Sequence, residues 1–282
     1  MRVLVTGYNG QLGFDVVRRL ESLGIECRGV DIQDFDLTQA AAVEAYIRSY
    51  APDTVVHCAA FTAVDRAEDD RDLCYAVNVT GTENIAKTCQ AIGARMMYFS
   101  TDYVFDGEGD QPFEIDAPYG AKSYYGQTKA LGEEKVREWV DRHYIVRISW
   151  VFGLNGHNFV KTMLRLGKER TDINVVADQI GSPTYTADLA ILLCDMLQTD
   201  KFGTYHASNE GYCSWYDFAV AIMQEAGLHC QVHPVTSEQY PAKAERPKNS
   251  RLSKASLDSA GFARLPAWQD ALKRYLKELG RA

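Results

Sequence analysis

The first 24 residues constrain the fold of this chain most strongly. Residues 2–5 form a short apolar, β-branched run that is typical of a buried strand. Three glycines follow at a spacing of three: Gly7, Gly10 and Gly13. Apolar side chains then recur at helical spacing until Gly24, at Leu12, Val16, Val17, Leu20 and Leu23. The stretch therefore predicts a strand, a glycine-rich turn and a helix, in that order.

This order of elements is typical of a dinucleotide-binding site. Gly7 would let the chain turn sharply off the strand, Gly10 would let backbone N–H groups approach a pyrophosphate, and Gly13 would let the helix lie close to the sheet. The anion would then lie at the positive end of the helix dipole. A glycine-rich turn without any ligand is the alternative that the glycines alone leave open.

Composition narrows the class of protein. The chain has 282 residues, of which 46% are hydrophobic and 24% charged, as in an ordinary globular protein with one large domain or a domain and a smaller lobe. A net charge of −8 argues against nucleic acid and anionic membranes as partners. The seven scattered cysteines indicate a reducing compartment and give no support to a zinc site. Without a signal peptide or a membrane-length apolar run, we expect a cytoplasmic protein.

Strands and helices alternate through the first half of the chain. Further strand-like runs, separated by helical segments, cover residues 26–31, 52–60, 95–101 and 144–149. This alternation predicts an α/β fold with a doubly wound, Rossmann-type parallel sheet. The pattern loosens beyond residue 150, and residues 231–250 hold three prolines and little periodicity. We expect a dinucleotide-binding domain from residues 1–149 and 177–208, and a smaller α/β lobe at the carboxyl edge of the sheet from residues 150–176 and 209–282.

The residues that follow the predicted strands fit a cofactor site. Asp31 lies about 20 residues beyond the glycine turn, where a carboxylate can bind the adenosine ribose and would repel a 2′-phosphate, which favours NADH. A solvated aspartate at a strand end is the alternative. Ala59 and Ala60 are small enough for a cofactor to cross the sheet edge, or they fill the core. Thr101 ends a later strand with a hydroxyl.

Tyr125 and Lys129 are the residues that indicate chemistry. At i and i+4 on a predicted helix, they face the same way. A nearby ammonium favours the phenolate, so we expect Lys129 to lower the pKa of Tyr125 and make it a proton donor to a developing alkoxide. Thr101 would donate a hydrogen bond to the same oxygen, and Lys129 would also reach the cofactor ribose. The Tyr-x-x-x-Lys spacing is weak evidence alone, and its place after the glycine turn and the strand ends strengthens it.

This order of parts resembles the extended short-chain dehydrogenase/reductase family and, within it, the dTDP-4-dehydrorhamnose reductases. The segments that carry the resemblance span nearly the whole chain, and the last three are the most specific to this branch: residues 61–68, 100–105, 125–129, 149–152 with 158–159, 178–184, and 246–252.

The resemblance implies a reaction and a set of site residues. Hydride would pass from NADH or NADPH to C4 of a dTDP-4-keto-6-deoxy sugar, with Thr101, Tyr125 and Lys129 catalytic and Tyr125 as the acid. Tyr103, Trp150 and Asn158 would lie near the sugar nucleotide, and the Arg246 guanidinium would meet its diphosphate. We expect the cofactor to contact Gly7, Asn9, Gly10, Gln11, Leu12, Asp31, Asp36, Leu37, Ala59, Ala60, Thr62, Asn78, Tyr125 and Lys129.

Several related functions compete with this interpretation. Sugar-nucleotide 4,6-dehydratases resemble this fold but carry a pair of acids after the threonine, which they need to eliminate water. Here Asp102 is followed by Tyr103, so the second carboxylate is missing. A UDP-sugar epimerase would share Tyr125 and Lys129, and only the branch-specific segments argue against it. A non-catalytic regulatory subunit, like the beta subunit of methionine adenosyltransferase, would keep the fold but would not need the intact Thr101, Tyr125 and Lys129.

A magnesium-linked homodimer occurs in some relatives, held through acids on the first helix. Asp15 lies on that predicted helix. A lone exposed aspartate is ordinarily solvated, so the sequence does not support Mg²⁺, while a homodimer stays open.

Overall fold

A six-stranded parallel sheet forms the centre of the computed structural model, which describes residues 1–280. Residues 281–282, the end of the predicted 209–282 segment, lie outside the described residues. The strand order is β2-β1-β3-β4-β5-β10, and every neighbouring pair is parallel. The strands are β1 (Arg2–Thr6), β2 (Glu26–Val30), β3 (Thr54–His57), β4 (Arg95–Thr101), β5 (His143–Ile148) and β10 (Gly203–His206). The predicted α/β parallel sheet is confirmed.

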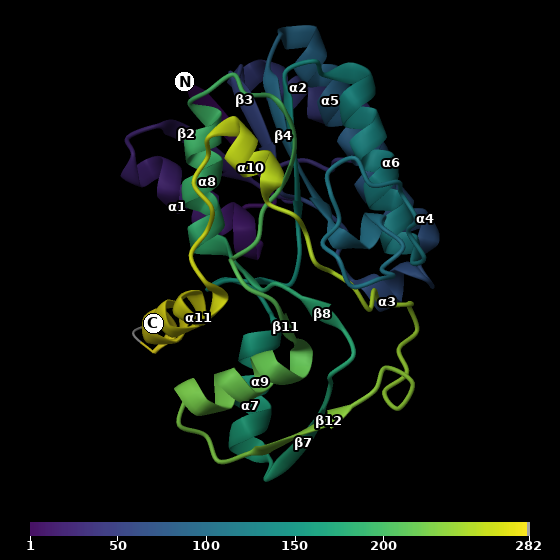
Figure 1. Cartoon of the computed structure of the whole chain (residues 1–282). Coiled ribbons are helices and arrows are strands. Elements are labelled where there is room, and N and C mark those ends of the chain that lie inside the picture. Colours follow the sequence, from purple (N-terminus) through teal and green to yellow (C-terminus); the bar gives the residue numbers. More distant parts are fainter. Residues whose placement is uncertain (281–282) are drawn as a thin grey trace.

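Helices cover both faces of this sheet (Figure 1). One face packs against α1 (Gln11–Ser22) and α8 (Thr186–Leu197), with α10 (Ala255–Ala260) beside them. The other face packs against α2 (Ala40–Tyr50), α5 (Thr82–Ile92) and α6 (Tyr124–Trp139). Alternate residues of β1 serve the two layers: Val3 and Val5 contribute to the first core and Leu4 to the second. Burial on both faces explains the continuous apolar run at the start of the chain.

The glycine turn leads into the point where the sheet reverses its winding. Because β1 lies between β2 and β3, the connections that leave β1 and β3 run to opposite faces of the sheet. Such a point opens a crevice at the carboxyl ends of the strands, where α/β proteins bind ligands. The fold therefore places a ligand-binding crevice directly after β1.

A second hydrophobic core lies below the sheet in Figure 1. It is built from α7 (Phe159–Glu169), β7 (Asp172–Val176), α9 (Trp215–Glu225), β12 (Gln231–Val235) and α11 (Trp268–Leu279). β12 pairs in parallel with β7 over five residues. The sequence indicated little structure in residues 231–250, because Pro234 and the exposed, alternating polar residues of β12 hide this edge strand.

Short ladders join the two cores. β6 (Val151–Phe152) pairs with β9 (Thr184–Tyr185), and β8 (Ile180–Gly181) pairs with β11 (Cys213–Ser214). The segments that follow β5 and precede α8 are thereby held together, below the carboxyl edge of the sheet.

The helical segment between β3 and β4 is divided into three parts. It begins as α4 (Arg71–Tyr75), passes through the π-helical turn η1 (Ala76–Gly81), and continues as α5. Two short elements, α3 (Val64–Ala67) and η2 (Asp102–Val104), follow β3 and β4. A π-helical turn inside a helix frequently marks a functional region, and this one contains Asn78.

Asp15 is buried, contrary to the expectation of an exposed side chain. Only 4% of its surface is exposed, because α8 packs across α1 and places the Thr186 hydroxyl as a donor to the Asp15 carboxylate. Arg18 lies 3.5 Å from the same carboxylate, and burial raises the pKa of Asp15. Among residues 1–280, no three His, Cys, Asp or Glu side chains are grouped to hold a metal ion.

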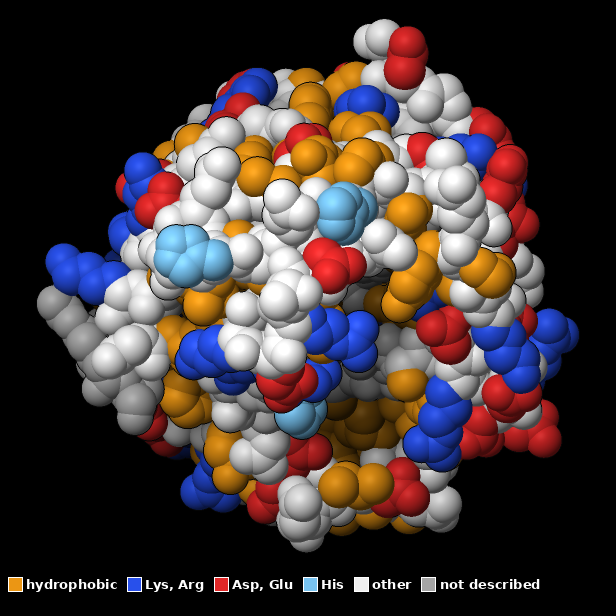
Figure 2. Space-filling model, turned by 90° about the horizontal axis from the view of Figure 1, so that it is seen from below, with side chains coloured by type: hydrophobic (Ala, Val, Ile, Leu, Met, Phe, Trp, Pro, Cys, Tyr) orange, Lys and Arg blue, Asp and Glu red, His pale blue; other side chains and the backbone are white. Residues whose placement is uncertain are grey.

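The surface carries charges of both signs. Figure 2 looks at the molecule from below the view of Figure 1, and lysine or arginine side chains alternate there with aspartate and glutamate. Within the described residues, no helix combines the length and apolar character needed to cross a bilayer.

Candidate active site

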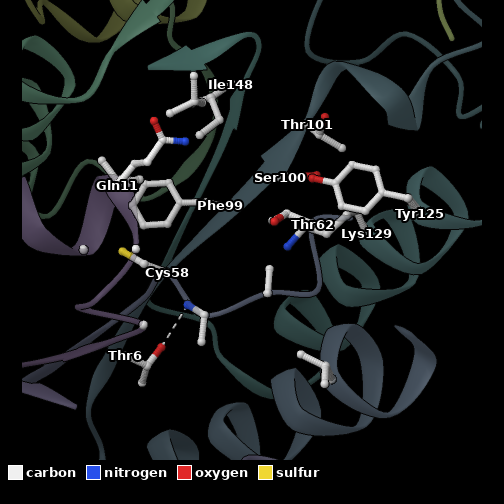
Figure 3. Close-up of a pocket in the computed structure, with 18 of the residues that line it drawn as sticks. Thr6, Gln11, Cys58, Thr62, Phe99, Ser100, Thr101, Tyr125, Lys129 and Ile148 are labelled. Carbon is white, nitrogen blue, oxygen red and sulfur yellow. Dashed lines mark hydrogen bonds between the residues drawn. The ribbon is translucent and has the colours of Figure 1, made fainter. Parts of the chain in front are cut away.

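A cavity of about 710 Å³ opens along the carboxyl edge of the sheet. Its walls come from the ends of β1, β3, β4 and β5 and from the start of α6 (Figure 3). Most of the predicted site residues line it: Gly7, Gly10, Gln11, Leu12, Asp31, Asp36, Leu37, Ala59, Ala60, Thr62, Thr101, Tyr103, Tyr125, Lys129 and Trp150.

The glycine turn forms one end of this cavity. Gly7 has a φ of 67°, and a Cβ there would lie 2.7 Å from the Ala59 Cα. A Cβ on Gly13 would lie 2.4 Å from the Gly7 carbonyl oxygen, so glycine is needed for α1 to start this close to the turn. Gly10 is the N-cap of α1 and offers no side-chain acceptor to the first N–H groups. These N–H groups, beside the cavity, fit a pyrophosphate.

Two backbone N–H groups hold the Asp31 carboxylate at the mouth of the cavity. Its Oδ1 accepts from the Ile32 N–H at 2.8 Å, and its Oδ2 accepts from the Asn9 N–H at 3.3 Å. Asn9 itself does not line the cavity; its carbonyl accepts a hydrogen bond from Asn155 at 2.6 Å. Asn9 therefore ties the turn to Asp31 and to the loop after β6.

Asn78 also lies outside the cavity but supports its wall. Its Oδ1 accepts from the Phe61 N–H at 2.8 Å, and its Nδ2 donates to the Phe61 carbonyl at 3.1 Å and to the Thr128 hydroxyl at 3.0 Å. The buried amide thus joins η1 and α6 to the segment that carries Ala60 and Thr62. Its role in the structure is to position that segment.

Thr101, Tyr125 and Lys129 lie on one side of the cavity, across from Gln11 (Figure 3). Thr101 is the last residue of β4, and Tyr125 and Lys129 lie one turn apart on α6. The Ser123 hydroxyl caps this helix by accepting the Gly126 N–H at 3.2 Å. α6 therefore starts with its first turn against the end of β4, which brings the three side chains together.

Burial dominates the ionisation of these groups. It raises the pKa of Tyr125, with a further contribution from the charge of Asp102, and it lowers the pKa of Lys129 to about 7. The Lys129 ammonium lies 4.0 Å from the centre of the Tyr98 ring. The predicted lowering of the Tyr125 pKa is therefore wrong, because desolvation of the phenolate outweighs the hydrogen bond from Thr101, which lowers this pKa.

Two predicted substrate residues lie away from the main cavity. The Arg246 guanidinium forms two hydrogen bonds with the Asp65 carboxylate, at 3.0 and 2.6 Å, in a small recess that also contains Tyr103. Asn158 caps α7 by accepting the Lys161 N–H at 3.0 Å, and it donates to the Gln11 side chain at 3.1 Å. Asn158 thus contacts a cavity residue without lining the cavity.

The sequence interpretation missed several residues around the site. Phe99 and Ile148 form apolar walls, and their alternation with buried neighbours in β4 and β5 would have been the signal. Trp215 stacks on Trp150, with ring centres 3.7 Å apart and an angle of 12° between the planes. Trp150 has an unusual φ of 49°, which no sequence pattern reveals.

The buried Asp102 carboxylate was also missed as a partner of Thr101. The Thr101 hydroxyl donates to its Oδ1 at 2.9 Å. Burial raises the pKa of Asp102 to about 6, although hydrogen bonds from Ser250 and Thr101 oppose this rise.

Comparisons with known proteins identify the family of this chain. Residues 1–281 match the model of a family described as the RmlD substrate binding domain. The chain is 43% identical to the spore coat polysaccharide biosynthesis protein SpsK of Bacillus subtilis, covering 100% of this chain and 99% of that protein. It is 38% identical to dTDP-4-dehydrorhamnose reductase of Escherichia coli, covering 99% and 98% of the two chains.

A solved structure is similar over the same length. It is dTDP-4-dehydrorhamnose reductase from Bacillus anthracis in complex with NADP, 42% identical, with a TM-score of 0.96 and coverage of 98% of this chain and 99% of that chain. The resemblance seen in the sequence is confirmed. The chain belongs to the dTDP-4-dehydrorhamnose reductase family, a family of NAD(P)H-dependent oxidoreductases.

Proposed function

We propose that this protein reduces the C4 keto group of dTDP-4-dehydro-6-deoxy-L-mannose to give dTDP-L-rhamnose, with Tyr125 as the proton donor. The observation that carries the proposal is the convergence of Thr101, Tyr125 and Lys129 on one side of a cavity whose other end is a glycine turn. The names of the Escherichia coli and Bacillus anthracis relatives support the choice of substrate.

The cavity fits a nicotinamide dinucleotide. The N-terminus of α1 would take the pyrophosphate, and Asp31 and Asp36 at the mouth would take the adenosine end. Lys129 would bind the ribose next to the nicotinamide. When bound, NAD(P)H supplies the hydride that reduces the C4 carbonyl. Asp31 favours NADH on electrostatic grounds, and the NADP bound to the Bacillus anthracis relative shows that a member of this family also takes the phosphorylated form.

Tyr125 would protonate the oxygen at C4 of the sugar. Its raised pKa keeps the phenol protonated at neutral pH, so the proton is in place before the reaction starts. As negative charge develops on the C4 oxygen, a hydrogen bond from Thr101 and the charge of Lys129 would stabilise it. The low polarity that raises the pKa of Tyr125 also strengthens both interactions.

The second core, built from α7, β7, α9, β12 and α11, would support the binding of the sugar nucleotide beside this site. Tyr103 and Trp150 line the cavity and would contact the sugar. Arg246 would meet the diphosphate by exchanging one of its hydrogen bonds to Asp65 for a phosphate oxygen. Asn158 would orient the Gln11 side chain, to which it donates a hydrogen bond, and would not itself contact the substrate.

The test is oxidation of NADH and of NADPH in the presence of the dTDP-4-keto sugar. Tyr125→Phe should reduce kcat by at least about 100-fold while cofactor binding is kept, because only the acidic proton is lost. Tyr124→Phe is the matched control, since this neighbouring phenol on α6 lies against Arg71 rather than in the cavity. Equal turnover by the parent and Tyr125→Phe would contradict the role of Tyr125. Cofactor binding without any turnover by the parent would instead indicate a regulatory subunit.

A further inference from the structure

Ser250, in the segment of residues 246–252, is linked to the proposed catalytic residue Thr101 through the side chain of Asp102. Its hydroxyl donates a hydrogen bond to the Oδ2 of Asp102, whose Oδ1 accepts the Thr101 hydroxyl at 2.9 Å. Ser250 is 2% exposed and Asp102 is 1% exposed. A continuous buried chain of polar groups therefore joins Ser250 to Thr101.

Backbone hydrogen bonds fix Ser250 in this place. Its own N–H donates to the Ile180 carbonyl of β8 at 2.7 Å, and the N–H of Asn249 donates to the Gly107 carbonyl at 2.8 Å. The segment is thereby clamped between β8 and the loop that follows η2. The clamp fixes the backbone of Ser250 beside Asp102, so the serine hydroxyl is a preorganised donor.

The Asp102 carboxylate depends on uncharged donors. They are the hydroxyls of Ser250 and Thr101 and the backbone N–H groups of Asp102 and Tyr103. A buried carboxylate is costly unless its hydrogen bonds are satisfied. If one hydroxyl is lost, the carboxylate binds the remaining donors more strongly.

We propose that Ser250 is a positioning residue that acts through Asp102 on the hydroxyl of Thr101. This inference rests on the function proposed above. Thr101 has a single hydroxyl proton. Asp102 competes for this proton with the C4 oxygen of the sugar, on which negative charge develops during the reduction. Because Ser250 keeps Asp102 hydrogen-bonded, Thr101 can turn its proton to the developing charge at low cost. Without Ser250, the carboxylate retains that proton.

Protonation of Asp102 should reverse the effect of losing Ser250. A protonated Asp102 no longer attracts the Thr101 proton as an anion does, so Thr101 is free to serve the reacting oxygen. The titratable groups that couple to Asp102 are Tyr103 on its own segment and Tyr125 on α6, and burial raises the pKa of both, which keeps them protonated. Lys129 titrates in the same cavity in parent and variant alike, so its effect cancels in their ratio.

The experiment compares kcat and KM of Ser250→Ala with the parent protein from pH 5.5 to pH 8.5. We expect kcat to fall about tenfold above pH 7, with KM for the sugar nucleotide unchanged, and the deficit to shrink as the pH falls through the range where Asp102 takes up a proton. Ser250→Cys, which keeps the shape but donates weakly, should show the same pH-dependent deficit. A deficit of equal size at every pH, or a change in KM alone, would overturn the proposal.

A control and a second measurement separate this inference from the proposed function. Ser214→Ala removes another buried serine hydroxyl that donates to a carboxylate, that of Asp217 at 2.7 Å, and should leave the pH profile of kcat unchanged. Carbon-13 NMR titration of the Asp102 carboxyl, assigned with Asp102→Asn, should give a higher pKa in Ser250→Ala than in the parent. An unchanged pKa would overturn the inference even if the parent turned over no sugar nucleotide, a result that by itself contradicts only the proposed function.

Discussion

Lys129 shows how a single residue can serve function at the expense of stability. Its ammonium is buried against the Tyr98 ring, and desolvation lowers its pKa to about 7 from an ordinary value of 10.5. The unfolded chain therefore binds more protons than the folded protein between these two pH values, and the stability of the fold rises with pH across that window. Below about pH 7 the cost of burying Lys129 is fully present.

Lys129→Met should stabilise the protein while it reduces activity. We expect a higher free energy of unfolding at pH 7, and a gain that fades toward pH 10 as the unfolded lysine also loses its proton. Urea denaturation at the two pH values measures this difference. Lys135→Met on the same helix is the control, because Lys135 forms ion pairs near the surface and should change stability by less than about 1 kcal/mol. A Lys129 variant that is less stable than the parent at pH 7 would contradict this account.

Gly7 and Gly24 form a matched pair that separates backbone strain from lack of space. Their φ values are 67° and 66°, but a Cβ would clash with Ala59 at Gly7 and would meet open space at Gly24. Gly24→Ala should cost about 1 kcal/mol of stability from the left-handed backbone alone. Gly7→Ala should cost more and should also abolish cofactor binding, measured by nicotinamide fluorescence. Equal effects of the two substitutions would argue against the close packing of the glycine turn.

At the scale of elements, a buried ion pair fixes α6 to the sheet. Arg147 of β5 forms two hydrogen bonds of 2.8 Å with Glu133 of α6, and the two side chains are 2% and 0% exposed. Tyr119 and Arg137 add donors to the same carboxylate. Lys129 and Tyr125 lie one and two turns before Glu133 on α6. The ion pair therefore fixes the position of the helix that carries both side chains.

Glu133→Gln should destabilise the protein by about 3–5 kcal/mol, because Arg147 would stay buried without a counter-charge. Burial raises the pKa of Glu133, but the hydrogen bonds and charge of Arg147 outweigh it and lower the pKa to about 2 from 4.5. The pair therefore contributes stability above pH 4.5 that is lost as the pH falls toward 2, and the variant should lack this acid dependence. Denaturation of the parent, Glu133→Gln and the exposed neighbour Glu134→Gln at pH 7 and pH 3.5 measures it. A Glu133→Gln protein as stable as Glu134→Gln would contradict the proposed role.

At the scale of the whole molecule, the regular half of the fold could be predicted from the sequence and the irregular half could not. Apolar runs mark the buried strands, and the helical spacing of apolar residues marks the amphipathic helices. The bounds of the sheet strands and of most helices could therefore be predicted to within a few residues. β12 and the π-helical turn at Asn78 have no such period, since tertiary contacts decide them. Asp15 was placed in solvent because nothing local shows that α8, 171 residues further along at Thr186, covers it.

The candidate site divides in the same way. The glycine turn and the Tyr125–Lys129 pair are local patterns, and the structure places them on one cavity. The Asp65 partner of Arg246 lies 181 residues away in the chain, and the Ser250 partner of Asp102 lies 148 residues away. Such contacts depend on how the C-terminal segment returns to the sheet, and no spacing in the sequence reports them.

In the proposed reaction, the cavity brings a nicotinamide and a sugar C4 carbonyl together beside Tyr125. The most direct test uses NADPH or NADH that carries deuterium at both hydrogen positions of the nicotinamide C4, together with the dTDP-4-keto sugar, followed by NMR of the product. We predict dTDP-L-rhamnose with deuterium at C4 of the sugar. A product without deuterium at C4, or cofactor that stays reduced beside unchanged sugar nucleotide, would contradict the account.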